Sequence, residues 1–185
     1  NWLGAGGIPC PGETESQQQL IWNLPDVTGI DRERFQGKRT LVVGSGFSAA
    51  TTVVDLADLA REVTGTSAVW LTRSNRERPI EELVDDPLTE RADLTRRANA
   101  LAAEQGGVVE WRPASVVQSL EKNADGFSVT VEAKTNGDTR RDRLNVDEIV
   151  AQVGYRPDRS LYEELQVHEC YATQGPIKLA AALLG

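Results

Sequence analysis

The chain contains few of the side chains on which most hydrolytic and metal-dependent chemistry relies. Its 185 residues include one histidine, two cysteines and no methionine. His168 has no serine or cysteine motif that would complete a catalytic triad, so we expect a surface or packing role for it. Cys10 and Cys170 form no C-x-x-C pair, which excludes a thioredoxin-type dithiol and the usual zinc-ligand spacing. We predict buried or incidental thiols and no metal site, and a disulfide between the two is the alternative.

Methionine is missing even from position 1, where the chain begins with Asn1. This absence predicts a piece of a longer protein, and removal of the original first residues is the alternative. Long hydrophobic runs and a signal-peptide pattern are also missing, so we expect a cytoplasmic protein without a membrane span. The net charge of -8 disfavours a nucleic-acid or anionic-membrane partner, because phosphates would be repelled. A hydrophobic content of 39% is ordinary for a globular chain with one core.

The most informative segment that is present is a glycine turn. A β-rich run, Thr40 to Val43, leads directly into G-x-G-x-x-A, and a long helical pattern follows. In such a turn Gly44 permits the tight strand-to-helix bend, Gly46 lets a pyrophosphate approach the backbone, and a small residue at position 49 lets the helix pack on the sheet. A tight turn without a ligand, with ordinary first-turn helix residues, is the alternative. The dinucleotide site predicted here comprises Gly44, Ser45, Gly46, Phe47, Ser48 and Ala49.

The order of the predicted elements is strand, helix, strand, helix, strand, then an antiparallel meander and a last buried strand. This order predicts an α/β fold: a Rossmann-like parallel sheet with helices on both faces and an inserted antiparallel β-meander. Residues 1–16 are rich in glycine and proline and predict an ordered loop, and residues 17–35 predict a connector with a short helix near Asp31. The expected parallel strands are Thr40–Val43, Ser67–Thr72, Val108–Trp111 and Glu148–Val153; the expected helices run from the glycine turn to Val63 and from Leu88 to Gln105; the meander comprises Ala114–Leu120, Gly126–Glu132 and Thr139–Leu144.

The tip of the second strand indicates which dinucleotide is bound. An acidic residue at this place binds the ribose of NAD, whereas arginine suits the 2′-phosphate of NADP. Here no acidic residue stands at the tip, and Arg73, Arg76 and Arg78 follow it. Because a guanidinium matches phosphate geometry and stays charged, we predict NADP(H), with these three arginines as binding residues. An exposed loop in which they pair with glutamates is the alternative, with Glu77, Glu81 and Glu82 as the partners.

Gly154 ends the last predicted strand, at the edge where open α/β sheets bind their ligands. A glycine there lets the backbone approach the cofactor, so we include Gly154 among the binding residues. The following Arg156-Pro157 predicts an extended exit from the strand. A simple strand-to-loop turn explains the segment equally well.

Together these residues resemble the NAD(P)-binding domain of flavoproteins with two dinucleotide domains, the class that contains thioredoxin reductases and flavin-containing monooxygenases. The segment Leu41–Ala49 is similar to the G-x-G-x-S-G/A motif of the monooxygenase branch. Arg73 falls where NADPH-using members place a phosphate-binding arginine. The stretch 147–158 resembles the A-T-G-x-R-P segment of the class, although Ala151–Pro157 departs from it. The resemblance covers roughly residues 38–158.

The resemblance implies a lead-in (1–37) from a missing FAD domain, an NAD(P)-binding domain (38–158) and a tail (159–185) that returns toward the FAD domain. The chain has no second G-x-G-x-x-G for FAD and no later T-x-G-D segment. FAD is therefore expected in the parent protein and is not bound by this chain alone. The implied function is to present NADPH for hydride transfer to that flavin in an oxidoreductase or monooxygenase. The cofactors carry the chemistry, so we predict no catalytic residue here and no activity of the chain alone.

Two other functions stay open. The first is a non-catalytic Rossmann module that senses NADP(H) or mediates protein contacts. The second, weaker one is a self-contained short-chain reductase. That class commonly uses a Tyr-x-x-x-Lys pair, and none of Tyr155, Tyr162 and Tyr171 has a lysine four residues on.

Overall fold

The computed structural model describes residues 1–83, 85–135, 138–155, 163–165, 167–170 and 175–184. It divides into two compact units, Asn1–Gly154 and Tyr155–Gly185. The second unit contains a short 3-10 helix, η3 (Glu163–Leu165), and helix α5 (Ile177–Leu184). Here the Ile177 N–H donates to the His168 carbonyl oxygen at 2.8 Å. The side chain of His168 is exposed, as predicted.

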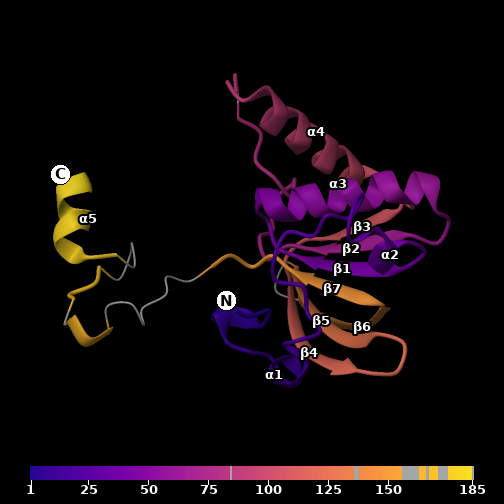
Figure 1. Cartoon of the computed structure of the whole chain (residues 1–185), viewed down its shortest axis with the longest axis horizontal. Helices are drawn as coiled ribbons and strands as arrows, with labels where there is room; N and C mark the ends of the chain where they lie inside the picture. Colours follow the sequence, from indigo (N-terminus) through magenta and orange to yellow (C-terminus); the bar gives the residue numbers. More distant parts are fainter. Residues whose placement is uncertain (84, 136–137, 156–162, 166, 171–174, 185) are drawn as a thin grey trace. The chain divides into compact units, whose positions relative to one another are not determined.

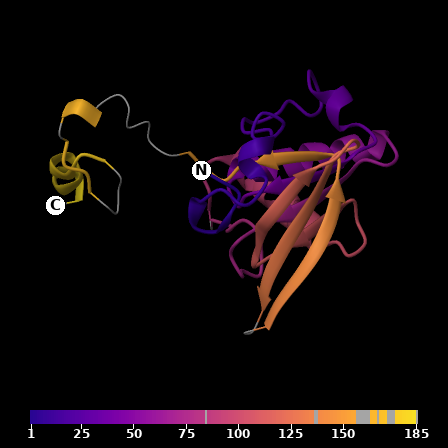
Figure 2. The ribbon, with the colours of Figure 1, turned by 90° about the horizontal axis from the view of Figure 1, so that it is seen from below.

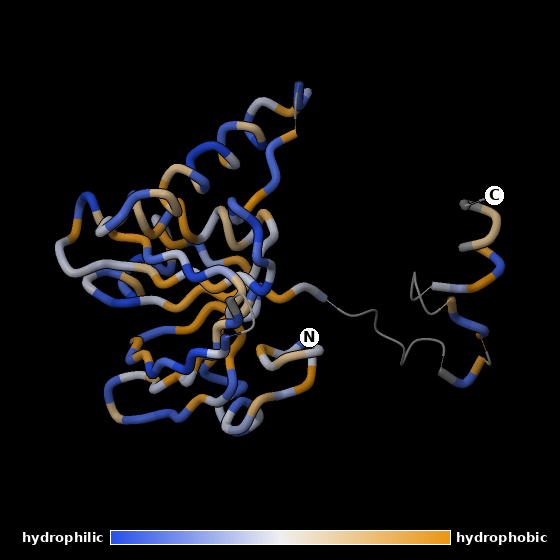
Figure 3. Tube along the Cα trace, turned by 180° about the vertical axis from the view of Figure 1, so that it is seen from behind, coloured by the Kyte–Doolittle hydropathy of each residue, from blue (hydrophilic) through white to orange (hydrophobic). Residues whose placement is uncertain are grey.

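The first unit is built on a parallel sheet of four strands in the order β3-β2-β1-β7 (Figure 1). In β1 and β2 every residue after the first is buried, as in sheets that are covered on both faces. The hydrophobic segments accordingly lie along these strands in Figure 3. The bounds are β1 Arg39–Val43, β2 Ser67–Leu71, β3 Val109–Arg112 and β7 Glu148–Ala151.

Two long helices cover one face of this sheet, α3 (Phe47–Glu62) and α4 (Thr89–Ala103) (Figure 1). Helix α3 lies directly on the strands and buries a broad apolar stripe at helical spacing, which includes Leu56 and Leu59. Trp70 of β2 is fully buried beneath it. Each such side chain contributes about 1.5–3 kcal/mol by its removal from water.

The antiparallel sheet covers the other face. It consists of β4 (Ser115–Lys122), β5 (Phe127–Thr135) and β6 (Asp138–Val146), in that order, and Figure 2 shows its strands running out beside the parallel sheet. Alternate residues of β5 pack against the second face of β1 and β2 in one hydrophobic cluster. The predicted fold class is confirmed, with one difference: the meander stands where we expected helices, because its one-sided apolar pattern supplies the needed cover.

The N-terminal segment is more structured than predicted. It contains a 3-10 helix, η1 (Ala5–Gly7), and the helices α1 (Glu13–Ser16) and α2 (Arg32–Phe35). The prediction of a loop is therefore wrong for α1. The fully buried carboxylate of Glu13 accepts the N–H of Leu3 at 2.7 Å and the N–H of Cys10 at 2.9 Å, which fixes this segment.

Cys10 is a free, buried thiol, as predicted. Burial, together with the nearby charge of Glu13, raises the pKa of Cys10 from 9.0 to about 12. The thiolate is the reactive form, so Cys10 at pH 8 is far less reactive than an exposed thiol. We expect iodoacetamide at pH 8 to leave Cys10 unlabelled in the folded chain and to label it in urea. Mass spectrometry of the Cys10 peptide checks this, and equal labelling in both states would contradict the buried position.

Candidate functional site

The carboxyl ends of three neighbouring parallel strands bring the predicted site segments to one edge of the sheet. The Gly44 N–H donates to the Leu71 carbonyl oxygen at 3.1 Å, which joins the glycine turn to the end of β2. On its other side, the Gln152 N–H donates to the Val43 carbonyl oxygen at 2.8 Å, which joins the turn to the exit of β7. The chain leaves β1 toward β2 and returns later to β7 on the opposite side. This edge is therefore the topological switch point, where open α/β sheets bind ligands.

Gly44 occupies a position that only glycine fits. Its φ of +149° is disfavoured for other residues, and a Cβ there would lie 2.2 Å from the Gln152 carbonyl oxygen. The Gly44 carbonyl oxygen in turn accepts a hydrogen bond from Trp70 Nε1 at 2.8 Å. The turn is thus held rigidly between β2 and β7.

The N-terminus of α3 is open to solvent. Gly46 is the N-cap residue, no side chain caps the helix, and the first turn has no acidic residue. A Cβ on Gly46 would meet nothing within 4 Å. The first N–H groups of a helix lack intrahelical acceptors and carry partial positive charge, so this end can bind an anion. Ala49 is fully buried against the sheet, whereas Ser45, Gly46, Phe47 and Ser48 are exposed.

The three arginines of the loop after β2 differ in their partners. Arg76 pairs with Glu81 at 3.5 Å, and Arg78 pairs with Glu82 at 2.7 Å, as the alternative of a charged loop predicts. A hydrogen bond from Asn99, with Arg78 beside it, lowers the pKa of Glu82 below its usual value, so this partner is ionised at neutral pH. Arg73 is exposed and makes no ion pair with any residue that the structure describes. Arg73 is therefore the arginine whose charge is not compensated.

Gly154 lies at the exit of β7, with a φ of +81° that favours glycine. The Asn1 side-chain amide donates to the Val153 carbonyl oxygen at 3.1 Å, next to Gly154. The backbone conformation alone accounts for a glycine here, and its role in binding stays a prediction. The predicted Arg156-Pro157 exit lies outside the described residues.

Two features of the site were not predicted from the sequence. Trp70 belongs to a strand that we assigned to the core, yet its indole also anchors the glycine turn. At the exit of β7, Gln152 Nε2 donates to Thr52 Oγ1 of α3 at 2.9 Å, which ties this helix to the last strand. Gln152 belongs to the stretch that departs from A-T-G-x-R-P. This departure is the one feature of the sequence that could have pointed to a special role of Gln152.

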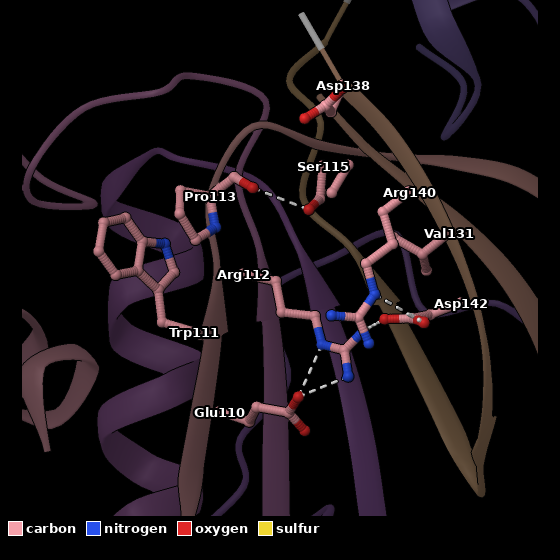
Figure 4. Close-up of a pocket in the computed structure, with 10 residues that line it drawn as sticks. Glu110, Trp111, Arg112, Pro113, Ser115, Val131, Asp138, Arg140 and Asp142 are labelled. Carbon is pink, nitrogen blue, oxygen red and sulfur yellow. Dashed lines mark hydrogen bonds and ion pairs between the residues drawn. The ribbon is translucent and has the colours of Figure 1, made fainter. Parts of the chain in front are cut away.

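A cavity of about 670 Å³ lies elsewhere, between the end of β3 and the strands β5 and β6 (Figure 4). Arg112 lies between two carboxylates there, with Nη2 2.6 Å from Glu110 Oε1 and Nη1 3.1 Å from Asp142 Oδ2. Its Nε also donates to Glu110, so all three nitrogens of Arg112 face a carboxylate, which disfavours phosphate binding. None of the predicted site residues lines this cavity.

The described ranges contain neither a metal-ligand cluster nor a membrane-spanning helix. No cluster of three or more histidine, cysteine, aspartate or glutamate residues that could hold a metal ion occurs in these ranges. Likewise, among the helices of the described residues, none has the length and apolar character needed to cross a bilayer.

Comparison with solved structures shows the same fold in larger proteins. Lactococcus lactis thioredoxin reductase matches with a TM-score of 0.57 and 20% identity, over 90% of this chain and 47% of that one. The bacillithiol disulfide reductase of Bacillus cereus matches with a TM-score of 0.61 and 16% identity, over 91% and 42%. The FAD-bound cadaverine monooxygenase of Erwinia amylovora matches with a TM-score of 0.61 and 17% identity, over 92% and 48%. The chain thus spans about half the length of these proteins.

A comparison with curated protein sequences gave no match. The sequence pattern of one family, described as pyridine nucleotide-disulphide oxidoreductase, matches residues 4–177, which is nearly the whole chain. This family includes the type of domain that the glycine turn and the meander resemble. The chain therefore belongs to the pyridine nucleotide-disulphide oxidoreductase family.

Proposed function

We propose that this chain binds NADP(H) for an FAD-dependent oxidoreductase or monooxygenase and presents NADPH to a flavin held by sequence outside these residues. The family binds FAD and NAD(P), which supports the class of ligand. The observation that carries the proposal is the combination of two features at one edge of the sheet. These are the uncapped N-terminus of α3 and the exposed Arg73, which has no ion-pair partner among the described residues.

The residues present fit this cofactor. The open space at Gly46 and the N–H groups of the first turn of α3 would hold the pyrophosphate. Arg73 would hold the 2′-phosphate, and Arg76 or Arg78 would join it by exchanging a glutamate for the phosphate. Such exposed ion pairs contribute little, about 0–1 kcal/mol each, so the exchange costs little. When bound, NADPH supplies the hydride, and this chain's residues bind and orient the cofactor.

We also propose that residues 1–37 and 159–185 connect the domain of residues 38–158 to the FAD-binding part of the parent protein. The family match extends over both flanks, from residue 4 to residue 177, which supports this assignment. In α5 the side chains of Ile177 and Leu179 are about half exposed, at 49% and 55%. An apolar helix face of this kind is typical of a surface that another domain covers.

The proposal is tested by comparing NADPH with NADH on the whole 185-residue chain. Isothermal titration calorimetry should show tighter binding of NADPH. At a hundredfold excess over its dissociation constant, NADPH should stabilise the folded chain by about 2.7 kcal/mol, which raises the melting temperature. No stabilisation by NADPH would contradict dinucleotide binding, and equal stabilisation by NADH would contradict the specificity.

The flavin part of the proposal needs the parent protein. We expect the protein that contains this chain to carry bound FAD with the absorption of a flavin, and NADPH to bleach that absorption. A colourless parent protein that still binds NADPH would contradict hydride transfer while leaving the binding site intact.

A further inference from the structure

Arg91, in the first turn of α4, places its guanidinium over the ring of Phe47, the first residue of α3. The Cζ atom of Arg91 lies 6.0 Å from the ring centroid, within the range of a cation–π contact. Phe47 belongs to the glycine turn, and its side chain is 43% exposed. The contact therefore brings the N–H donors of Arg91 next to a helix N-terminus whose own N–H groups lack acceptors. An anion bound there can accept hydrogen bonds from both.

Asp86 fixes the orientation of this guanidinium. Its carboxylate accepts hydrogen bonds from Nε of Arg91 at 2.7 Å and from Nη2 at 2.5 Å. It also accepts one from the Leu88 N–H at 3.0 Å. The hydrogen bonds from Arg91 lower the pKa of Asp86, so the carboxylate is ionised at neutral pH. The Asp86 side chain is only 4% exposed. Arg91 is thus held in place before any ligand arrives.

The guanidinium keeps donors for a further acceptor. Arginine has five N–H groups, and Asp86 takes up those of Nε and one at Nη2. Nη1 makes no hydrogen bond with any residue that the structure describes, and the side chain is 33% exposed. Arg97 on the same helix differs: its Nη2 donates to both carboxylate oxygens of Asp58, which ties α4 to α3.

We propose that Arg91 is a further binding residue of the nucleotide site and pairs through Nη1 with the pyrophosphate of a bound dinucleotide. This inference rests on the proposed function. We assign Arg91 to the pyrophosphate, and not to another group of the dinucleotide, because Phe47, which Arg91 covers, directly follows Gly46 at the start of α3. Arg73 follows a different strand, β2. Arg91 therefore serves NADH and NADPH alike, whereas Arg73 serves NADPH alone.

The test compares the dissociation constants of NADPH and NADH for the wild-type chain and for Arg91→Ala. We expect Arg91→Ala to weaken both cofactors by about tenfold, the usual effect of removing one charge-assisted hydrogen bond. Arg96→Ala is the matched control, because Arg96 lies on the same helix and pairs with Asp93 at 3.2 Å. It should leave both constants unchanged. Circular dichroism melting of each variant checks that the fold is retained.

A second variant separates direct binding from a structural role of the pair. Asp86→Asn keeps one side-chain oxygen that can accept from Arg91 and removes a negative charge near the proposed pyrophosphate, so it should bind NADPH at least as tightly as the wild type. A loss as large as that of Arg91→Ala would instead show that the pair only positions α4, and would overturn the proposal. Unchanged affinity in Arg91→Ala, or a loss confined to NADPH, would overturn it as well. A wild-type chain that binds neither dinucleotide would overturn the proposed function itself.

Discussion

Replacing Gly44 by alanine is expected to lower the free energy of unfolding by about 2–5 kcal/mol. The added Cβ would lie 2.2 Å from the Gln152 carbonyl oxygen, which belongs to the backbone at the exit of β7 and has no room to rotate away. The φ of +149° adds strain for any residue with a side chain. Urea denaturation followed by circular dichroism measures the change. Dinucleotide binding should be lost too, because the turn must move away from β7.

Gly46→Ala is the matched control for this variant. The same methyl group enters open space there, at a φ of -96° that alanine adopts readily. We expect unchanged stability, but a loss of at least about tenfold in affinity for both NADPH and NADH, because the methyl stands where the pyrophosphate would approach. Equal stability of the two variants would contradict the close contact at Gly44. Full cofactor binding by Gly46→Ala would contradict the proposed position of the pyrophosphate.

Replacing Arg73 by alanine is expected to weaken NADPH binding by about 10- to 100-fold and to leave NADH binding unchanged. The charge of Arg73 is not paired with any described residue, so its loss breaks no internal ion pair. A hydrogen bond between charged groups contributes about 1.5–3 kcal/mol, which corresponds to this factor. Calorimetric titration with both cofactors measures the ratio, and high salt should reduce the difference.

Two other arginines serve as controls for Arg73: Arg76 in the same loop and Arg61 in α3. Arg76→Ala should lower NADPH affinity less, because Arg76 already pairs with Glu81 at 3.5 Å. Arg61→Ala, at the far end of α3 and paired with Asp58, should have no effect on either cofactor. A loss shared equally by NADPH and NADH in Arg73→Ala would show that this arginine does not bind the 2′-phosphate.

Most of the parallel sheet could be predicted, because its strands are short apolar runs and its helices have clear periodicity. β1 begins one residue before the predicted Thr40, and β2 ends one residue before the predicted Thr72. The meander strands extend further than predicted, since β5 and β6 continue as a paired hairpin beyond the apolar core. Pairing of backbone groups lengthens these strands, and hydropathy alone does not reveal it.

Two features could not be predicted from local patterns: the formation of helix α1, and which element covers the second face of the parallel sheet. Helix α1 has four residues, too few for an isolated helix. It forms where the buried Glu13 accepts two backbone N–H groups from the preceding loop. Which element covers a sheet face depends on contacts between segments that are distant in the sequence, such as Leu41 with Val129 in one cluster.

The place of the candidate site could be predicted better than its contacts. The rule that ligands bind at the carboxyl ends of parallel strands brought Gly44, Arg73 and Gly154 to one edge. The anchoring of the turn by Trp70 depends on the neighbouring position of β1 and β2. The contact between Arg91 and Phe47 depends on the path of the loop before α4. Neither contact can be predicted from the spacing of residues in the sequence.

The pairing of β1 with β7 fixes when this site is completed. Thr40 lies opposite Glu148 across the two strands, so most of the domain stands between them in the sequence. During synthesis the glycine turn emerges well before the Gln152 backbone that supports it. Contacts between such distant segments form late and slow folding. A nascent chain released before β7 would carry the whole glycine motif and still lack the backbone against which the turn is held.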